Sequence, residues 1–454
     1  MKRKPLISKG LSPLQVFRLG LIALVTFTLL QLPIYEGKAF FTLLHPNPED
    51  TFMDFFNSVH EAANSADPYT QRGVIYPPLT YLFYRMCAMV LPGGQTALQW
   101  RNSQQGLLLI LAITVLTMVA LYRTLRSEDK RFNRTVLWVL LGTVPFWYAL
   151  ERGNLILQSL VFVAYFIRHY RSESKVKREL ALISLAISAA IKIYPALFGV
   201  LLLLNKQFKE AVRCILYGLI AVFAPFAIFG GMDAIAALVG NIANANDAMA
   251  IRGWGYKVNL QNTMEFLAES FHVGIRGTRW AKALMGVMLI FTLLFTRKDW
   301  QRYMALTGAV VLYPAFSYTY TLIFAVIPLL TFLREAPRAS LRNLLFSLLF
   351  LGLFAPFPLD GGSLFDKAPV YPYMLNLTTA ISGFALLAMV AMMVWDVIAC
   401  RWGSAAGEDK QLSVLGLTVP LTTVLFCVIA LILLILVAGW YFYCDGLYKM
   451  DIVS

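Results

Sequence analysis

Apolar stretches of roughly 20 residues recur along the chain, and short polar or basic segments separate them. An apolar helix of about 20 residues crosses the hydrocarbon core of a bilayer, which is about 30 Å thick. The pattern therefore predicts an all-α integral membrane protein with about 13 transmembrane helices. The predicted spans are 14–34, 104–122, 135–150, 154–169, 178–191, 194–204, 211–230, 279–296, 303–316, 318–333, 342–357, 373–398 and 413–441.

The segment 77–92 does not fit this series, because it is short and follows Tyr76-Pro77-Pro78. Irregular backbone is tolerated at membrane depth only where the protein shields it. We therefore expect this segment to be re-entrant or to lie along the membrane interface, and whether it crosses the membrane stays open.

Composition agrees with a membrane protein. The 454 residues are 59% hydrophobic and 14% charged, with a mean hydropathy of +0.65, whereas soluble domains are about 25% charged. The five cysteines include no Cys-x-x-Cys pair, and the four histidines show no metal-ligand spacing. The sequence therefore predicts no disulfide framework, no zinc site and no cofactor, and leaves a divalent metal ion open.

The net charge of +14 comes largely from basic residues that gather in connecting segments. These clusters include Lys2, Arg3, Lys4, Lys9, Arg123, Arg126, Lys130, Arg131, Arg134, Arg168, Arg171, Lys175, Lys177, Arg178, Arg297, Lys298, Arg302, Arg334, Arg338 and Arg342. Cytoplasmic loops of membrane proteins carry such an excess of lysine and arginine. This rule predicts a multi-pass protein of the inner (cytoplasmic) membrane with a cytoplasmic N-terminus and exterior loops over 35–76 and 231–278. Orientation explains the basicity, so nucleic acid is not an expected partner.

The first exterior loop contains the main candidate for chemistry. Apolar residues at helical spacing predict a short amphipathic helix over 49–64 at the membrane surface: Phe52, Phe55, Phe56 and Val59. Asp50, Asp54, Ser58 and Glu61 fall on the opposite, polar face. Asn47-Pro48-Glu49-Asp50 has the pattern of a helix N-cap and acidic first turn, which accounts for Asp50. Asp54 is predicted to lie past that turn, so it is either a catalytic carboxylate or a solvated surface residue.

Other polar residues interrupt apolar segments at the same predicted side. Glu151-Arg152-Gly153-Asn154 forms a tight turn, Lys192-Ile193-Tyr194-Pro195 marks the tip of a helical hairpin, and Tyr313 to Tyr320 is an aromatic break. Ionisable residues within membrane segments are costly and are functional or paired by default; for Lys192, snorkelling to the interface is the alternative. The candidate substrate-binding residues are Arg72, Tyr76, Arg152, Asn154, Lys192, Tyr194, Arg252, Lys257, Tyr318 and Tyr320, with Asp54 as the candidate catalytic residue. Cations suit a phosphate and tyrosines suit sugar hydroxyls, so this set favours a phosphate-linked, carbohydrate-like ligand.

At these residues the chain resembles the polytopic membrane glycosyltransferases of the GT-C class, in particular glycosyltransferase family 87. The matching motifs, which cover roughly residues 14–335, are Asp54, Pro68-Tyr69, Tyr76-Pro77-Pro78, Gly153-Asn154, Lys192 to Pro195 and, loosely, Asn259-Leu260-Gln261-Asn262. Two motifs depart from the family pattern. The family's Gly-Gln-x-Asn turn is Glu-Arg-Gly-Asn here, and its late Ser-Pro element is present only as Tyr313-Pro314-Ala315-Phe316-Ser317.

The resemblance implies a GT-C-like bundle that uses a polyprenyl-phosphate sugar donor and needs neither a nucleotide sugar nor an obligatory metal. We therefore expect a catalytic module over 1–335 and a C-terminal scaffold or lipid groove over 336–454. The predicted reaction moves a hexose or pentose, with inversion, to a hydroxyl of a lipid-linked or cell-envelope glycan outside the cytoplasm, with Asp54 as general base. The predicted partners are the donor, the glycolipid or glycan acceptor and membrane lipids. Two alternatives stay open: a lipid-linked glycan polymerase or ligase, and a lipid or solute transporter.

Overall fold

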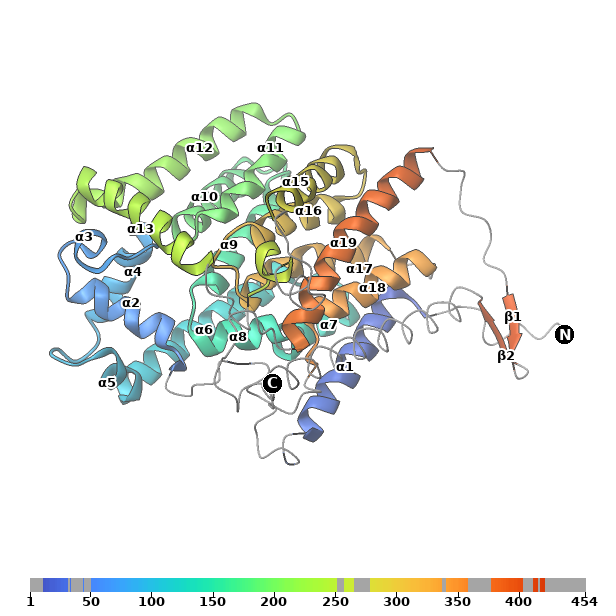
Figure 1. Cartoon of the computed structure of the whole chain (residues 1–454), viewed down its shortest axis with the longest axis horizontal. Helices are drawn as coiled ribbons and strands as arrows, with labels where there is room; N and C mark the ends of the chain where they lie inside the picture. Colours follow the sequence, from blue (N-terminus) through green and yellow to red (C-terminus); the bar gives the residue numbers. More distant parts are fainter. Residues whose placement is uncertain are drawn as a thin grey trace, which may run out of the picture. The chain divides into compact units, whose positions relative to one another are not determined.

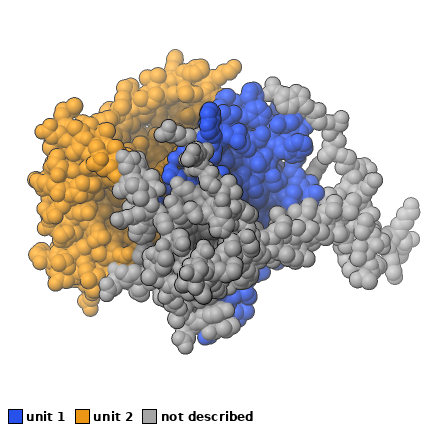
Figure 2. All heavy atoms as spheres, viewed as in Figure 1, with its two compact units in different colours: residues 1–42, 254–312, 325–454 blue, residues 43–253, 313–324 orange. Residues whose placement is uncertain are grey.

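The computed structural model describes residues 11–31, 33, 44, 50–250, 257–264, 278–336, 340–357, 377–402, 411–414 and 417–420. The chain divides into two compact units (Figure 2). Unit 1 comprises residues 1–42, 254–312 and 325–454, and unit 2 comprises residues 43–253 and 313–324. Asp54 lies in unit 2.

Unit 2 is made of helices joined by short turns (Figure 1). Its first helices are α2 (Met53–Ala63), α3 (Pro68–Arg72), α4 (Pro78–Ala88), α5 (Ala97–Asn102), α6 (Gln104–Leu125), α7 (Lys130–Gly142), α8 (Val144–Arg152) and α9 (Ile156–His169). They are followed by α10 (Lys175–Ile191), η3 (Tyr194–Gly199), α11 (Val200–Leu204), α12 (Phe208–Phe223), η4 (Ala224–Ile228), α13 (Met232–Ala250) and η5 (Thr319–Ala325). The η elements are short 3₁₀ helices.

Polar side chains define where the helices of unit 2 begin. The Ser103 hydroxyl accepts a hydrogen bond from the Gly106 N–H at the start of α6, and Asp129 accepts one from Arg131 N–H at the start of α7. These caps satisfy backbone donors that have no partner inside the helix. Long helices of unit 2 pack along one another, as α10 does against α9 and α12.

The two ends of α10 differ in character. At its start, Arg178 and Glu179 face α12, where Arg213 Nη1 lies 2.7 Å from a Glu179 carboxylate oxygen. The neighbouring α9 ends in the same basic region, because Arg178 of α10 donates to the Ser172 carbonyl just after α9 at 3.1 Å. Arg168, near the end of α9, donates to the backbone oxygen of Thr124 at 2.6 Å. Lys192 follows the other end of α10. The basic loops of unit 2 therefore lie at one end of this helix and Lys192 at the other.

Unit 1 contains α1 (Pro13–Gln31), α15 (Thr278–Phe295), α16 (Asp299–Leu312), α17 (Val326–Glu335), α18 (Leu341–Phe354), α19 (Leu377–Trp402) and the antiparallel strands β1 (Gln411–Val414) and β2 (Leu417–Pro420) (Figure 1). A charged cluster joins three of these helices. Asp396 of α19 is 1% exposed, and its carboxylate lies 2.5 Å from both Lys298 Nζ and Arg342 Nη1. Gln301 of α16 donates to the same carboxylate at 2.7 Å.

The helical, membrane-type architecture is confirmed. Among the described helices, four are long and apolar enough to cross a membrane: Pro13–Gln31, Gln104–Leu125, Phe208–Ile228 and Thr378–Cys400. Shorter apolar helices accompany them, such as Ile156–His169 and Leu341–Phe354. The count of about 13 crossings and the re-entrant course of 77–92 stay predictions, although α4 forms a helix within the latter segment.

Several predicted helix boundaries differ from the structure, and three differences have a visible cause or consequence. The span expected over 135–150 is broken into α7 and α8 at Thr143, because Pro145 in the first turn of α8 cannot donate to a continuing helix. The helix expected over 49–64 begins only at Met53. The span expected from 413 begins with strand residues rich in β-branched side chains instead, and its part beyond 420 lies outside the described residues.

Candidate active site

Two backbone segments that are distant in sequence approach each other closely at the start of α2. Phe52 precedes the helix in a left-handed conformation (φ 62°), and its N–H donates to the Glu151 carbonyl at 2.7 Å. Gly153 ends α8 with φ 65°, and a Cβ atom placed on it would lie 3.0 Å from the Phe55 Cβ. Glycine is favoured at Gly153 by both its backbone conformation and this close contact.

This approach places the residues on either side of Gly153 against Asp54. Arg152 donates to Oδ1 of Asp54 from Nε at 3.1 Å and from Nη2 at 2.5 Å. Asn154 donates to Oδ2 at 2.9 Å, and its own Oδ1 accepts the Ile156 N–H at 3.1 Å. The carboxylate is therefore held on both oxygens while its side chain stays 21% exposed.

Asp54 lies in the first turn of α2, not past it as the sequence suggested. Carboxylates are favoured there because they complement the positive end of the helix dipole. That preference explains an acidic residue at this position, but it does not explain the paired contacts with Arg152 and Asn154. Those contacts come from a turn 98 and 100 residues away in sequence.

Two sets of hydrogen bonds hold Tyr76 beside this centre. The Tyr69 hydroxyl donates to the Tyr76 carbonyl at 2.9 Å, and Asn241 of α13 donates to the Tyr69 carbonyl at 2.9 Å. The Thr80 hydroxyl, in the first turn of α4, donates to the Ile191 carbonyl at the end of α10 at 3.1 Å. The loop that carries Tyr76 is thereby fixed next to the residue that follows α10, which is Lys192.

Lys192 is buried and stacks on Tyr76. Lys192 as a whole is only 7% exposed, and its Nζ lies 3.8 Å from the centre of the Tyr76 ring. Among the residues that the structure describes, the Lys192 amine forms no ion pair and no hydrogen bond. Burial lowers the pKa of Lys192 to about 7, and the nearby Asp54 carboxylate opposes that effect. A cation–π contact is weaker than an ion pair, so this amine has capacity for an anionic ligand.

Aromatic rings of η5 and α8 complete the centre. Tyr320 stacks on Tyr148 at a centroid distance of 5.6 Å, and Tyr318 lies 5.6 Å from Tyr320. Tyr194 packs edge-on against Phe324 at 6.0 Å. Asp54 and Arg152 are within electrostatic range of the Tyr318 hydroxyl, and Asp54 is within range of Tyr76. One end of unit 2 thus combines a carboxylate, two cations and several tyrosines, without a metal-type group of three His, Cys, Asp or Glu among the described residues.

The amino-acid sequence matches the model of glycosyltransferase family 87 over residues 75–317, which is more than half of the chain. The chain belongs to this family. Comparison with curated proteins finds no match. The resemblance inferred from the motifs is therefore confirmed, and membership of family 87 indicates a glycosyltransferase. The matched range includes Tyr76, Arg152, Asn154 and Lys192, whereas Asp54 precedes it, so the case for Asp54 rests on its contacts.

The structure brings eight of the eleven predicted site residues to this one end of unit 2: Asp54, Tyr76, Arg152, Asn154, Lys192, Tyr194, Tyr318 and Tyr320. Three others stand apart. Arg72 is exposed on α3, where it interacts with Glu61. Arg252 lies outside the described residues. Lys257 is buried in unit 1, so its relation to Asp54 stays a prediction.

The polar face that the sequence predicted for α2 is partly buried in the structure. Ser58 is 6% exposed and lies beside the Tyr84 hydroxyl of α4, while Glu61 lies beside Tyr81. Burial raises the pKa of Glu61, which the Arg72 cation and Tyr81 partly offset. Tyrosines at helical spacing on α4 were the available signal, because a buried polar face needs hydrogen-bonding partners.

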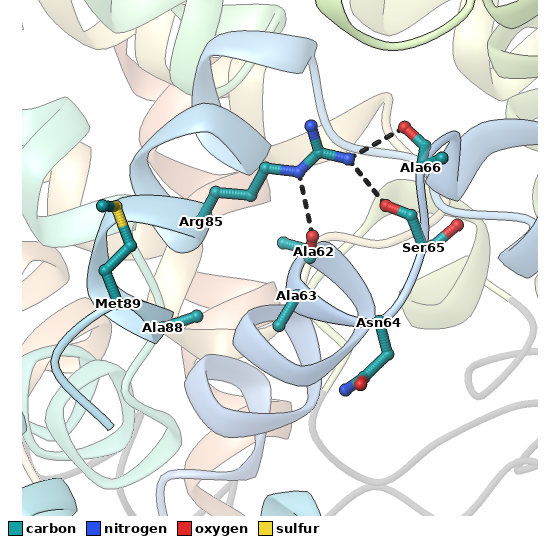
Figure 3. A pocket seen from close by; sticks show the side chains of 8 residues that line it. All are labelled: Ala62, Ala63, Asn64, Ser65, Ala66, Arg85, Ala88 and Met89. Atoms are coloured by element: carbon teal, nitrogen blue, oxygen red, sulfur yellow. Dashed lines mark hydrogen bonds between the residues drawn. The ribbon is translucent and has the colours of Figure 1, made fainter. Parts of the chain in front are cut away.

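Arg85 fixes the other end of α2 in this family 87 chain (Figure 3). Its Nε donates to the Ala62 carbonyl at 3.0 Å, and its Nη2 donates to the carbonyls of Ser65 and Ala66 at 2.6 and 2.8 Å. The guanidinium also lies 4.3 Å from the centre of the Phe229 ring. Arg85 therefore satisfies one carbonyl in the last turn of α2 and two in the segment that follows it, beside a surface hollow of about 660 Å³.

An apolar groove begins one residue after Lys192. It has a volume of about 570 Å³ and is formed by α10, η3, α11, α12, η4 and α13 of unit 2. Ile193 and Ala196 line it next to Lys192, and Leu185 and Cys214 line it farther along α10 and α12. All of its lining residues are apolar, which makes it suitable for a hydrocarbon chain.

Proposed function

We propose that this family 87 glycosyltransferase transfers a hexose or pentose from a polyprenyl-phosphate donor to a hydroxyl of a lipid-linked or cell-envelope glycan. The observation that carries the proposal is the pairing of a held carboxylate, Asp54, with a buried amine free to bind an anion, Lys192. A polyprenyl phosphate joins an anionic head to a long hydrocarbon chain. The amine and the adjoining apolar groove match those two parts.

In the proposed reaction, Asp54 takes the proton from the acceptor hydroxyl while that oxygen attacks the anomeric carbon. The bond between the anomeric carbon and the phosphate oxygen breaks, and its electron pair leaves with the polyprenyl phosphate. A single displacement of this kind inverts the configuration. General base catalysis contributes about 10²–10⁴-fold. Cations that face the leaving phosphate contribute through electrostatic stabilisation, which is usually the larger effect.

The proposed face of the reaction is extracytoplasmic. Asp54 and Lys192 lie at the end of unit 2 opposite its basic loops, as the position of Lys192 directly after α10 indicates. Basic loops gather on the cytoplasmic side of membrane proteins. A lipid-linked donor suits that exterior location, since its hydrocarbon chain keeps it in the membrane.

The proposal is tested with purified protein in liposomes and a panel of polyprenyl-phosphate sugars, by measuring donor consumption and product formation. Asp54→Asn should reduce transfer at least 10²-fold, by the usual size of general base catalysis, without weakening donor binding. Asp233→Asn is the matched control, because Asp233 is an exposed carboxylate in the first turn of α13. Near-normal turnover by Asp54→Asn would refute the base assignment. Consumption of no polyprenyl-phosphate sugar would refute the donor class, and uptake or flipping without transfer would favour a transporter.

A further inference from the structure

Arg152 binds one oxygen of the candidate base, Asp54, with two hydrogen bonds. Two of its nitrogens, Nε and Nη2, donate to the same oxygen of Asp54. The third, Nη1, donates to the Asp50 carbonyl at 3.3 Å and lies 3.7 Å from an Asp50 carboxylate oxygen. Asn154 holds the remaining oxygen of Asp54. Both oxygens of Asp54 are therefore engaged in this structure.

The proposed reaction moves one negative charge away from Asp54. A polyprenyl-phosphate sugar is a phosphodiester with one negative charge, and the departing polyprenyl phosphate is a monoester with up to two. Asp54 starts with one negative charge and becomes neutral when it takes the acceptor proton. If Arg152 stayed on Asp54, its positive charge would face the negative carboxylate before the reaction. After the reaction it would face a neutral carboxyl group, while the new charge lies on the departing phosphate.

We propose, on the basis of the function proposed above, that Arg152 exchanges partners, so that the donor phosphate draws its guanidinium off Asp54 and frees the base. The planar guanidinium fork fits a carboxylate and a phosphate equally, which a lysine amine does not. Contact with Asp50 provides a second anchor while the other nitrogens change partner. Lys192, which is buried against Tyr76, keeps its position and receives the phosphate.

Partner exchange makes donor binding a competition between phosphate and Asp54 for Arg152. It also predicts that the donor binds before the acceptor, because Asp54 accepts a proton only after Arg152 has moved. Premature activation of water by Asp54 is thereby limited in the donor-free protein. Such competition is measurable without any turnover.

The test is a double-mutant cycle on the binding of farnesyl phosphate, a short isoprenyl phosphate, to the full-length protein in detergent. Asp54→Asn removes the competing charge and should tighten binding by about tenfold when Arg152 is present. With Arg152→Gln in the background, the same change should alter binding by less than about twofold. Glu61→Gln is the matched control, because Glu61 is on the same helix and interacts with Arg72 instead; it should leave binding unchanged.

The outcomes separate this inference from the proposed function. An Asp54→Asn effect of equal size in both backgrounds, or an equal effect of Glu61→Gln, would show general electrostatics and overturn partner exchange. Failure of all variants to bind farnesyl phosphate would overturn the proposed donor class as well. If Arg152→Gln does not fold, Arg152→Lys replaces it, since lysine keeps the charge but lacks the fork. The Asp54→Asn effect should then fall below about threefold, and a full tenfold effect would refute the inference.

Discussion

Replacement of Gly153 by alanine tests whether the close approach of α2 and the turn after α8 builds the site. Gly153 has φ 65°, where an L-residue costs roughly 1–2 kcal/mol. Its new Cβ would also lie 3.0 Å from the Phe55 Cβ and 3.4 Å from the Phe52 Cα. Phe55 is fully buried and packs edge-on against Phe56 and Tyr84, so it cannot move aside at low cost.

The strain should therefore be relieved by a shift of the turn, which carries Arg152 and Asn154. A displacement of about half an ångström at the proposed catalytic carboxylate should lower kcat by roughly tenfold, since about 1 Å costs on the order of 10²-fold. Gly73→Ala is a closely matched control. Gly73 has φ 67° but nothing within 4 Å of the added Cβ.

The assay compares both variants for donor consumption in liposomes and for thermal unfolding in detergent. Both should lose a similar amount of stability from backbone strain, but only Gly153→Ala should lose kcat by roughly tenfold. Equal kcat values for Gly153→Ala and Gly73→Ala would refute the reasoning, because they would show that the contact with Phe55 does not hold the site in place.

Two further predictions concern charged residues. Because burial lowers the pKa of Lys192 to about 7, its amine is protonated below that pH and neutral above it. The kcat/KM for the donor should fall as pH rises through about 7, and Lys192→Arg should flatten the profile between about pH 6 and 9; an unchanged slope in this variant would exclude Lys192. In unit 1, Asp396→Asn leaves Lys298 and Arg342 without their shared carboxylate. The side chains of those cations are 32% and 43% exposed, so solvent screens part of the lost attraction. The free energy of unfolding, measured in detergent, should fall by about 1–3 kcal/mol, and the affinity for farnesyl phosphate should not change.

Much of the candidate site could be predicted because polar residues are costly in apolar surroundings. Lys192 and the Arg152-Gly153-Asn154 turn stand out in the sequence for that reason, and both lie with Asp54 in the structure. Apolar runs also predicted helices such as α9 and α10 to within a few residues. Local pattern sufficed there because a membrane helix satisfies its backbone hydrogen bonds within itself.

Features that depend on distant contacts could not be predicted. Helix α2 starts late because Phe52 donates to Glu151, a bond that no local pattern encodes. Ser58 is buried beside Tyr84 of α4, a contact that an amphipathic pattern alone does not encode. Tyr148 escaped notice because a single tyrosine in an apolar helix is equally typical of an aromatic belt.

The length of α10 connects the site with the membrane. Its 17 residues span about 25 Å, close to the thickness of a hydrocarbon core of about 30 Å. Arg178 and Glu179 at its start face the charged start of α12, and Lys192 at its end faces Tyr76. In the topology proposed from the sequence, α10 crosses the membrane, so its basic region and the candidate site would lie near opposite membrane faces. In that topology the positive-inside rule supplies the direction, and it supports the proposal that Asp54 faces the outside of the cytoplasm.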